Sequence, residues 1–93
     1  MMSDIPILVC TSVNDIKAAR DIANKLLTKK YSPCINILSN NESIYVWNNN
    51  IENTNEYILL IKSDKSKFKN IEKLILAIHP YEIPEILAIS LLV

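Results

Sequence analysis

Hydrophobic residues recur along the first third of the chain in two different patterns. A continuous apolar run from Ile5 to Cys10 is typical of a β-strand that is covered on both faces. From Ile16 to Leu27, apolar residues recur at three- and four-residue spacing with polar residues between them, which predicts an amphipathic helix. Asn14 or Asp15 would cap the start of this helix, and it should end near Lys29-Lys30.

The middle of the chain is rich in residues that favour β-structure. Cys34 to Leu38 and Ile44 to Trp47 are separated by polar residues, so they form either two strands or one long strand with a bulge, which we prefer. Asn48 to Asn50 predicts a hairpin turn, because Asn tolerates a left-handed backbone. The third strand then begins at Ile51, with its best-ordered part from Glu56 to Lys62.

The last third of the chain predicts one more helix and one more strand. Ser63-Asp64 would cap a helix whose apolar stripe runs from Phe68 to Ile78, and Pro80 should stop it at His79. A final strand follows from Ile86 to Leu92. The order βαββαβ predicts a ferredoxin-like α+β sandwich, with an antiparallel sheet in the order 4-1-3-2 and both helices on one face.

This arrangement leaves one face of the sheet uncovered. Two helices cover a single face, yet the first, third and last strands are apolar on both faces, over Ile5 to Cys10, Tyr57 to Ile61 and Ile86 to Leu92. The simplest cover for so much apolar surface is another copy of the same chain. The pattern therefore predicts an obligate homo-oligomer.

Composition narrows the class of protein. A chain of 93 residues has room for one domain, so we expect a single domain over residues 1–93. Ten Lys and Arg residues balance ten Asp and Glu residues, which removes the positive field of a nucleic-acid binder. The absence of Gly excludes the P-loop, the dinucleotide fingerprint and the nucleophile elbow.

The sequence also predicts where the protein works. The longest apolar stretches, Ile5 to Cys10 and Ile86 to Val93, are shorter than the roughly 18 residues of a membrane span. The start of the chain lacks the basic and apolar regions of a secretory signal. Cys10 and Cys34 fit free thiols in a reducing compartment. We expect a soluble cytoplasmic protein with no membrane partner.

Several segments together resemble the CutA divalent-cation tolerance proteins. In that family the hairpin reads S-x-Y-x-W-x-G and the third strand E-x-x-L-x-x-K-T, which are similar to Ser43–Trp47 and Glu56–Ser63 here. Cys34–Leu38 resembles the family segment A-C-V-N-I-L. The block His79–Ile86, HPYEIPEI, matches the family's helix exit H-P-Y-E-x-P-E and is the most specific of these segments.

The resemblance covers nearly the whole chain and carries its own expectations. It implies a compact trimer of ferredoxin-like subunits, similar in architecture to PII signalling proteins and assembled through the long central hairpins. It also implies an association with copper and other divalent metals. Two positions depart from the family pattern: Asn49 stands where Gly is usual in the hairpin, and Ser63 stands at the usual Thr.

Three residues are candidate metal ligands: Cys10, Cys34 and His79. Thiolate and imidazole are the ligands that copper and zinc prefer. The predicted topology puts Cys10 near His79 and places Cys34 at the opposite end of the sheet, two strand spacings away, beyond disulfide reach. The structural alternative is that both thiols are small buried hydrophobes and that His79 caps its helix.

Aromatic and charged residues are candidates for an intersubunit pocket or interface: Tyr45, Trp47, Glu56, Lys62, Tyr81, Glu82 and Glu85. Tyr45 and Trp47 alternate on one face of the hairpin, where they either pack between subunits or form a pocket wall. Glu56 and Lys62 should share one side of the third strand and pair across an interface. Glu82 and Glu85 are either hard metal ligands or solvated charges.

The resulting functional hypothesis is a homotrimeric, non-catalytic divalent-cation tolerance protein that binds copper or another divalent cation and no organic cofactor. The alternative is a PII-like signalling module that binds a small effector in clefts between subunits. Cys10 with His79 is the one pair that could serve as a nucleophile and base, and no oxyanion donors can be named beside it. We therefore expect no enzymatic activity.

Overall fold

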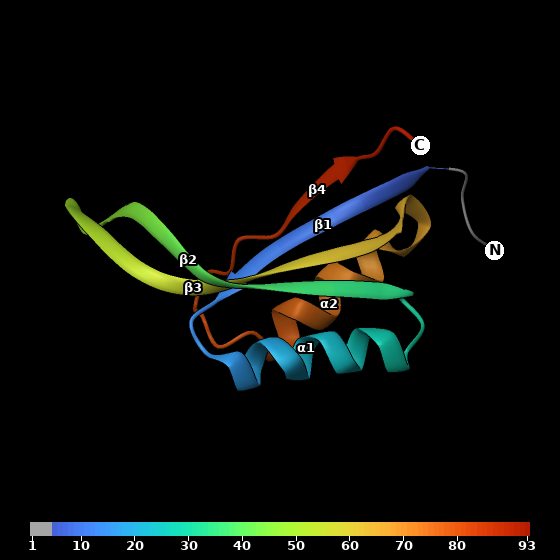
Figure 1. The fold of residues 1–93 in the computed structure, drawn as a ribbon, viewed down its shortest axis with the longest axis horizontal. Helices are drawn as coiled ribbons and strands as arrows, with labels where there is room; N and C mark the ends of the chain where they lie inside the picture. Colours follow the sequence, from blue (N-terminus) through green and yellow to red (C-terminus); the bar gives the residue numbers. More distant parts are fainter. Residues whose placement is uncertain (1–4) are drawn as a thin grey trace.

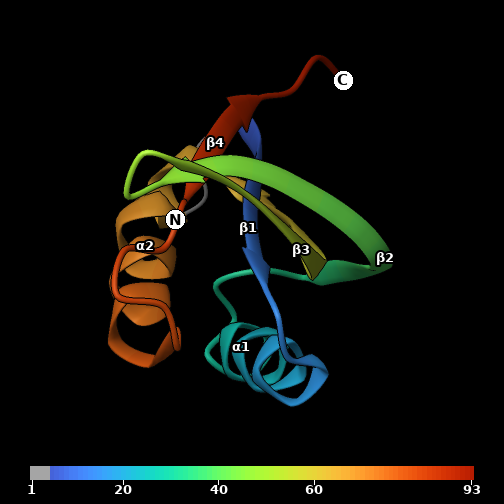
Figure 2. The ribbon, with the colours of Figure 1, turned by 90° about the vertical axis from the view of Figure 1, so that its left-hand side faces the viewer.

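A computed structural model describes residues 5–93 and has the predicted ferredoxin-like architecture (Figure 1). Its four strands form one sheet in the order β2-β3-β1-β4, and every neighbouring pair is antiparallel. Figure 2 shows both helices on the same side of the sheet. The elements are β1 (Pro6–Val13), α1 (Ile16–Thr28), β2 (Cys34–Trp47), β3 (Asn50–Asp64), the short 3-10 helix η1 (Lys65–Lys67), α2 (Phe68–Ile78) and β4 (Leu87–Ser90).

Both helices have ends that the sequence explains. The Asp15 carboxylate accepts hydrogen bonds from the backbone N–H groups of Lys17 and Ala18, at 3.2 and 3.3 Å, and so caps α1. Asp64 accepts from the N–H of Ser66 at 2.9 Å, but it caps η1 and not α2, so the helix begins later than the predicted cap implied. At the other end of α2, His79 is extended because Pro80 disfavours a helical backbone in the residue before it.

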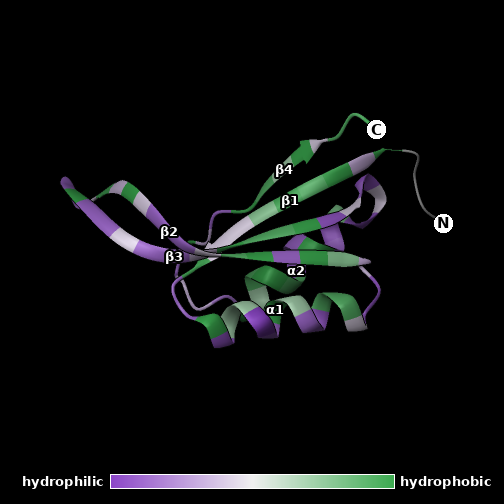
Figure 3. Ribbon diagram, in the orientation of Figure 1, coloured by the Kyte–Doolittle hydropathy of each residue, from purple (hydrophilic) through white to green (hydrophobic). Residues whose placement is uncertain are grey.

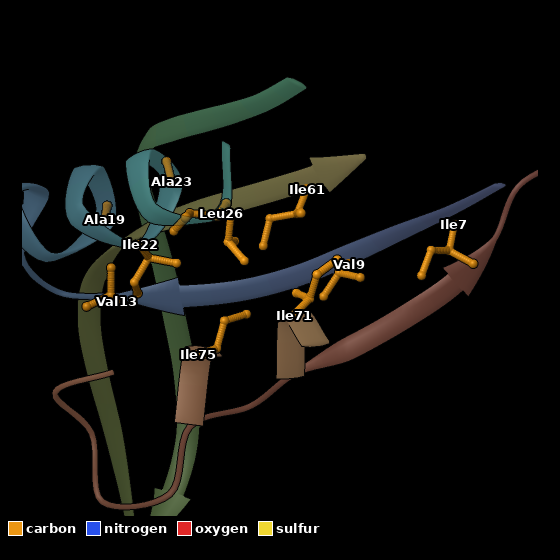
Figure 4. Close-up of a cluster of buried hydrophobic side chains, with 11 residues drawn as sticks. Ile7, Val9, Val13, Ala19, Ile22, Ala23, Leu26, Ile61, Ile71 and Ile75 are labelled. Atoms are coloured by element: carbon orange, nitrogen blue, oxygen red, sulfur yellow. The ribbon is translucent and has the colours of Figure 1, made fainter. Parts of the chain in front are cut away.

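The core lies between the sheet and the two helices (Figure 4). Along β1, the side chains of Ile7, Val9 and Val13 point into it, while Leu8, Cys10 and Ser12 face the other side of the sheet. The remaining members come from α1, β3 and α2: Ala19, Ile22, Ala23, Leu26, Leu59, Ile61, Ile71 and Ile75. No helix of the described residues is long and apolar enough to cross a membrane.

Three strand boundaries differ from the expected ones. β1 continues beyond Cys10 to Val13, because Thr11 and Ser12 pair with β3 although they interrupt the apolar run. β3 begins at Asn50, directly after the turn. β4 covers only Leu87–Ser90, since its pairing with β1 ends where β1 itself begins.

The second face of the sheet is open and apolar, as predicted. Alternation along the strands places Leu60 and Cys10 on this face, with Leu87 and Ile89 of the edge strand beside them. Leu87 and Ile89 are 51% and 52% exposed. Figure 3 shows the hydrophobic residues that run along β1 and β4. We call this side of the sheet, the side away from the helices, the open face.

The β2–β3 hairpin extends well beyond the rest of the sheet and gives the chain its longest dimension, 44 Å (Figure 1). Asn48 and Asn49 form its turn with positive φ angles of 51° and 65°. A register shift lies in β2 between Leu38 and Asn41, and Asn40 within it has a φ of 59°. The preferred prediction of one long strand with a bulge is therefore confirmed.

Candidate functional site

A hollow lies where the hairpin meets the loop that follows α2. It has a volume of about 680 Å³. Its walls come from the end of β1, from the hairpin and from the loop after His79. The residues that line it are Ser12, Asn14, Ser43, Ile44, Tyr45, Trp47, Glu52, Thr54, Glu56, Tyr81, Glu82, Ile83 and Glu85.

The bulge in β2 decides which side chains reach this pocket. β2 advances three residues between Leu38 and Asn41 while β3 advances two, so the alternation of β2 reverses at this point. Beyond the bulge, Tyr45 and Trp47 therefore share the face of Glu56 on β3. Without the extra residue, both aromatic side chains would point to the opposite face of the hairpin.

Glu56 is the buried charge at the base of the pocket, with only 7% of its surface exposed. Its carboxylate accepts a short hydrogen bond from the Tyr81 hydroxyl and a longer one, 3.5 Å, from the Ser12 hydroxyl. Burial, together with the hydrogen bond to Glu56 and the negative charge of that carboxylate, raises the pKa of Tyr81. Tyr81 therefore stays protonated at neutral pH and remains the donor to Glu56.

His79 holds the loop to the sheet through both of its ring nitrogens. Nδ1 accepts a hydrogen bond from the backbone N–H of Tyr81 at 3.1 Å, so Nε2 carries the proton and donates to the Ser12 carbonyl at 2.9 Å. Its ring also meets the Tyr81 ring edge-on, with centroids 4.7 Å apart. Because both nitrogens bind backbone groups, metal coordination by His79 would break one of these bonds.

The sequence alone did not single out the residues of β1 that complete this site. Ser12 binds both Glu56 and His79, and the Thr11 hydroxyl donates to the Glu85 carbonyl at 2.8 Å. Both residues lie beyond the apolar run, where the first strand was predicted to have ended. The sequence did contain a signal, because the polar pair Thr11-Ser12 lies between Val9 and Val13. A strand that continues through this pair places one of the two polar side chains on each face of the sheet.

The two cysteines lie on the open face and do not meet. Both are free thiols. Cys10 pairs with Leu60 and Cys34 pairs with Lys62, so two strand spacings, about 9.5 Å, separate them as predicted. Cys34 is offset by only two residues along the strands, not by the length of the sheet, because β1 continues past Cys10 to Val13. The expected placement of Cys34 at the opposite end of the sheet is therefore wrong.

The surroundings of the two thiols differ. Burial raises the pKa of the Cys10 thiol. Cys34 is exposed, and its sulfur lies 3.6 Å from the Lys62 Nζ, which also donates to the Asn36 Oδ1 at 2.6 Å. The ammonium of Lys62 is thus bound to its neighbours on β2, while Glu56 on the same side of β3 is bound to Tyr81.

The candidate ligands of one chain do not assemble into a metal centre. Among the described residues, no group of three His, Cys, Asp or Glu side chains is placed to hold a metal ion. His79 contacts Ser12, two residues beyond Cys10, and its nitrogens are occupied. The donor set of the described residues in one chain therefore does not fit a resident metal ion.

Comparison with known proteins establishes the family. A family model described as the CutA1 divalent ion tolerance protein matches residues 7–92. The chain belongs to this family. The match spans the described strands and helices from β1 to β4 except Pro6, and so confirms the resemblance of the hairpin, the third strand and the HPYEIPEI block.

Relatives in this family differ in length from the chain. The Protein CutA homolog of Xenopus laevis is 33% identical over 81 residues, which are 87% of this chain and 53% of that protein. The divalent-cation tolerance protein CutA of Pectobacterium atrosepticum is 33% identical over 88 residues, 95% of this chain and 79% of that protein. The chain thus spans about half the length of the Xenopus relative.

The fold agrees with solved structures of the family. The crystal structure of CutA1 from the psychrotrophic bacterium Shewanella sp. SIB1 superposes with a TM-score of 0.90 at 36% sequence identity. The superposition covers 94% of this chain and 81% of the Shewanella chain. The ferredoxin-like sandwich and the extended hairpin are therefore shared with an experimentally determined member of the family.

Proposed function

We propose that this protein is a non-catalytic divalent-cation tolerance protein that acts as a cytoplasmic homotrimer and binds copper or another divalent cation without an organic cofactor. The observation that carries the proposal is the apolar open face, which neither helix covers. Membership of the divalent ion tolerance family supports the cation, and two free thiols suit a reducing compartment.

Exposed aliphatic residues support self-association. On the outer side of the hairpin, which is the face opposite Tyr45 and Trp47, large aliphatic residues are exposed. They are Ile44, Val46 and Ile51, at 64%, 70% and 78%. Together with Leu87 and Ile89 on the open face, they are large apolar side chains that a single chain leaves in contact with water. A closed ring of identical subunits would bury both surfaces without adding an unlike partner.

The metal site of this proposal lies between subunits. Because one described subunit holds no group of three ligands, a cation needs donors from more than one copy. Cys10 and Cys34 are the soft donors on the face that assembly would bury. His79 instead serves as a structural residue in this proposal, since its ring nitrogens hold the loop to β1.

Titration of the purified protein with Cu(I) under reducing conditions tests the metal proposal. We expect Cys10→Ser and Cys34→Ser each to weaken binding, because the thiolates of both residues would ligate the ion. His79→Ala should lower the melting temperature and leave the affinity of the folded protein largely unchanged. Loss of binding in His79→Ala alone would place the site at the histidine, and unchanged binding in all three variants would remove these residues from the site.

The surroundings of Cys10 and His79 support a non-catalytic role. Burial raises the pKa of the Cys10 thiol, which keeps it protonated and weakly nucleophilic. The imidazole of His79 is bound at both nitrogens, so it has no free position for a substrate proton. The pocket beside Glu56 is the one observation that favours the alternative, a PII-like role with a small effector, because it offers a hollow of ligand size.

A further inference from the structure

Lysines gather at one end of a chain whose formal net charge is zero. The strand register places the end of α1 and the start of α2 at this same end of the sheet, since Cys34 at the start of β2 pairs with Lys62 near the end of β3 (Figure 1). Six lysines lie in these helix ends and the turns beside them, and we call this region the basic end: Lys25, Lys29, Lys30, Lys65, Lys67 and Lys69.

Acidic residues gather at the opposite end of the chain. Five of the ten lie in the hairpin or in the loop after α2, namely Glu42, Glu52, Glu56, Glu82 and Glu85. The zero net charge, from which the sequence predicts no anionic partner, is therefore the sum of a basic end and an acidic end.

Two hydrogen bonds join the two halves of the basic end. The Ser63 hydroxyl donates to the Tyr31 carbonyl at 2.6 Å, and the Ser32 hydroxyl donates to the Lys62 carbonyl at 2.6 Å. The turn after α1 is thus fastened to the end of β3, from which η1 and α2 follow. The backbone that carries the lysines is preorganised, so a partner need not order it on binding.

Most of the charge at the basic end is not neutralised within the chain. Lys25 pairs with Asp21 at 3.1 Å, and Lys69 lies 3.9 Å from Glu72. Among the described residues, the other four lysines of the basic end form no ion pair. Asp64 is buried and caps η1. The basic end therefore presents a positive field to its surroundings.

The basic end lies outside the surfaces that the proposed trimer buries, which are the open face and the outer side of the hairpin. Its lysines belong to the helices and turns on the other side of the sheet from the open face (Figure 2). They also lie at the end of the chain away from the tip of the hairpin (Figure 1). Because charged residues are depleted in the cores of protein interfaces, assembly leaves the basic end available to a partner.

An apolar hollow of about 400 Å³ opens at the basic end. It lies on the helix side of the sheet, because Ala88 and Ser90 pair with Val9 and Ile7, whose side chains point into the core. The residues that line it are Ile5, Ile7, Lys65, Phe68, Lys69, Ala88 and Ser90. Two lysines of the basic end thus stand beside an apolar floor, a combination that suits an anionic amphiphile.

The chemistry of the basic end favours a lipid surface over a nucleic acid. Nucleic-acid recognition relies on Arg forks and on accessible aromatic rings. All six cations here are lysines, and the one Arg of the sequence, Arg20, lies in the second turn of α1. Tyr31 and Phe68, which are aromatic residues of this region, are only partly exposed.

Clusters of lysines attract anionic headgroups, and attachment to a membrane is strengthened by a second, apolar contact. The basic end supplies both, because its lysines surround the apolar hollow. We propose that the basic end docks on the surface of an anionic lipid bilayer, with its lysines at the headgroups and the hollow in contact with a lipid chain.

Flotation with lipid vesicles tests this docking on the native protein. The protein should float with vesicles of phosphatidylcholine that contain phosphatidylserine, and it should not float with vesicles of phosphatidylcholine alone. Added salt should weaken the binding, because it screens the attraction between lysines and headgroups. Equal binding to both kinds of vesicle, or no binding to the anionic vesicles at low salt, would overturn the proposal.

A matched pair of lysine variants locates the charged contact. Lys65→Gln removes one charge beside the hollow but keeps the backbone N–H that donates to the Ile5 carbonyl at 2.9 Å, and it should weaken vesicle binding by about fivefold. Lys17→Gln removes the same charge from the first turn of α1, at the far end of that helix, so it should change binding by less than about twofold. Equal weakening by both variants, with unchanged melting temperatures, would show attraction to overall charge and overturn the proposal.

A second pair of variants tests the apolar contact. Ile5, which lines the hollow, is 43% exposed. Ile5→Ala leaves every charge in place and should weaken binding to the anionic vesicles by about threefold or more, whereas Ile5→Leu should keep it. Undiminished binding of Ile5→Ala would show that the lysines act alone and would overturn the contact with a lipid chain.

Other sources of phosphate are tested in the same assay. Duplex DNA that binds as tightly as the anionic vesicles, or inorganic phosphate that displaces the protein from them at matched ionic strength, would show a general affinity for phosphate and overturn the lipid assignment. Light scattering on the same samples separates this test from the trimer proposal, because the basic end belongs to one chain. A monomer that floats would support the basic end and refute the trimer, and a trimer that does not float would refute the basic end alone.

Discussion

At the residue scale, the account rests on the hydrogen bond from Tyr81 to the buried carboxylate of Glu56. We expect Tyr81→Phe to lower the free energy of unfolding by roughly 1–3 kcal/mol, because the ring is kept while a buried acceptor loses its donor. Urea denaturation measures this loss. Tyr31→Phe is the matched control, since no hydroxyl bond of Tyr31 is found in the described structure, and an equal loss there would contradict the role of Tyr81.

The pH dependence of stability gives a second readout of the same bond. Burial and the contact with Glu56 raise the pKa of Tyr81 in the folded protein above its ordinary value of 10.0. Its stabilising contribution is therefore fully present below about pH 10 and is lost as the pH rises toward the folded-state pKa. Above about pH 10, the unfolding free energy of the native protein should fall more steeply than that of Tyr81→Phe. Parallel curves would contradict this assignment.

Lys30 makes a different prediction about the end of α1. It has a φ of 61°, and the Tyr31 N–H beyond it returns to the Leu26 carbonyl at 3.0 Å, the pattern in which Gly is the favoured residue. Lys30→Gly should raise the melting temperature and add roughly 0.5–1 kcal/mol to the unfolding free energy. Asn49→Gly should add less, because Asn tolerates this conformation better; a destabilised Lys30→Gly would show that the lysine side chain contributes more than its backbone costs.

At the element scale, the bulge in β2 controls the composition of the pocket. Deletion of Asn40 should restore unbroken alternation and turn Tyr45 and Trp47 to the opposite face of the hairpin. The fluorescence maximum of Trp47 should then shift. Replacement of Asn40 by Gly keeps the length of the strand and its positive φ, and so should leave the fluorescence maximum unchanged. A deletion variant with native fluorescence would contradict the proposed reversal.

The helices and strands show which features a local sequence pattern can predict and which depend on residues far away in the sequence. The helical period of Ile16–Leu27 and the Asp15 cap predicted α1 almost to the residue, because both signals are local. The end of β1 was missed because Thr11 and Ser12 are polar and are ordered by pairing with distant β3 residues. The bulge was predicted from polar residues inside a strand. The face of the hairpin on which Tyr45 lies, however, could be determined only from the register of both strands.

At the scale of the whole molecule, the sequence predicted the uncovered face, whereas the position of the pocket within one chain needed the structure. Strands that are apolar on both faces need a cover on each face of the sheet. The sequence predicts only two helices, and both cover the same face, so the other face must be open. The pocket depends on three segments far apart in the sequence, which the topology brings to one end of the sheet. Of the candidates for that region, Tyr45, Trp47, Glu56, Tyr81, Glu82 and Glu85 line it, whereas Lys62 lies beside Cys34 instead.

The oligomeric state of the native protein tests the central claim most directly. Size-exclusion chromatography with multi-angle light scattering, at micromolar concentration and in reducing buffer, should give a mass of about 32 kDa, three times the 10.6 kDa of the chain. The open face and the outer side of the hairpin would then be buried between copies. A folded, soluble species of 10.6 kDa at the same concentration would contradict the account, because the apolar open face would then be stable in water.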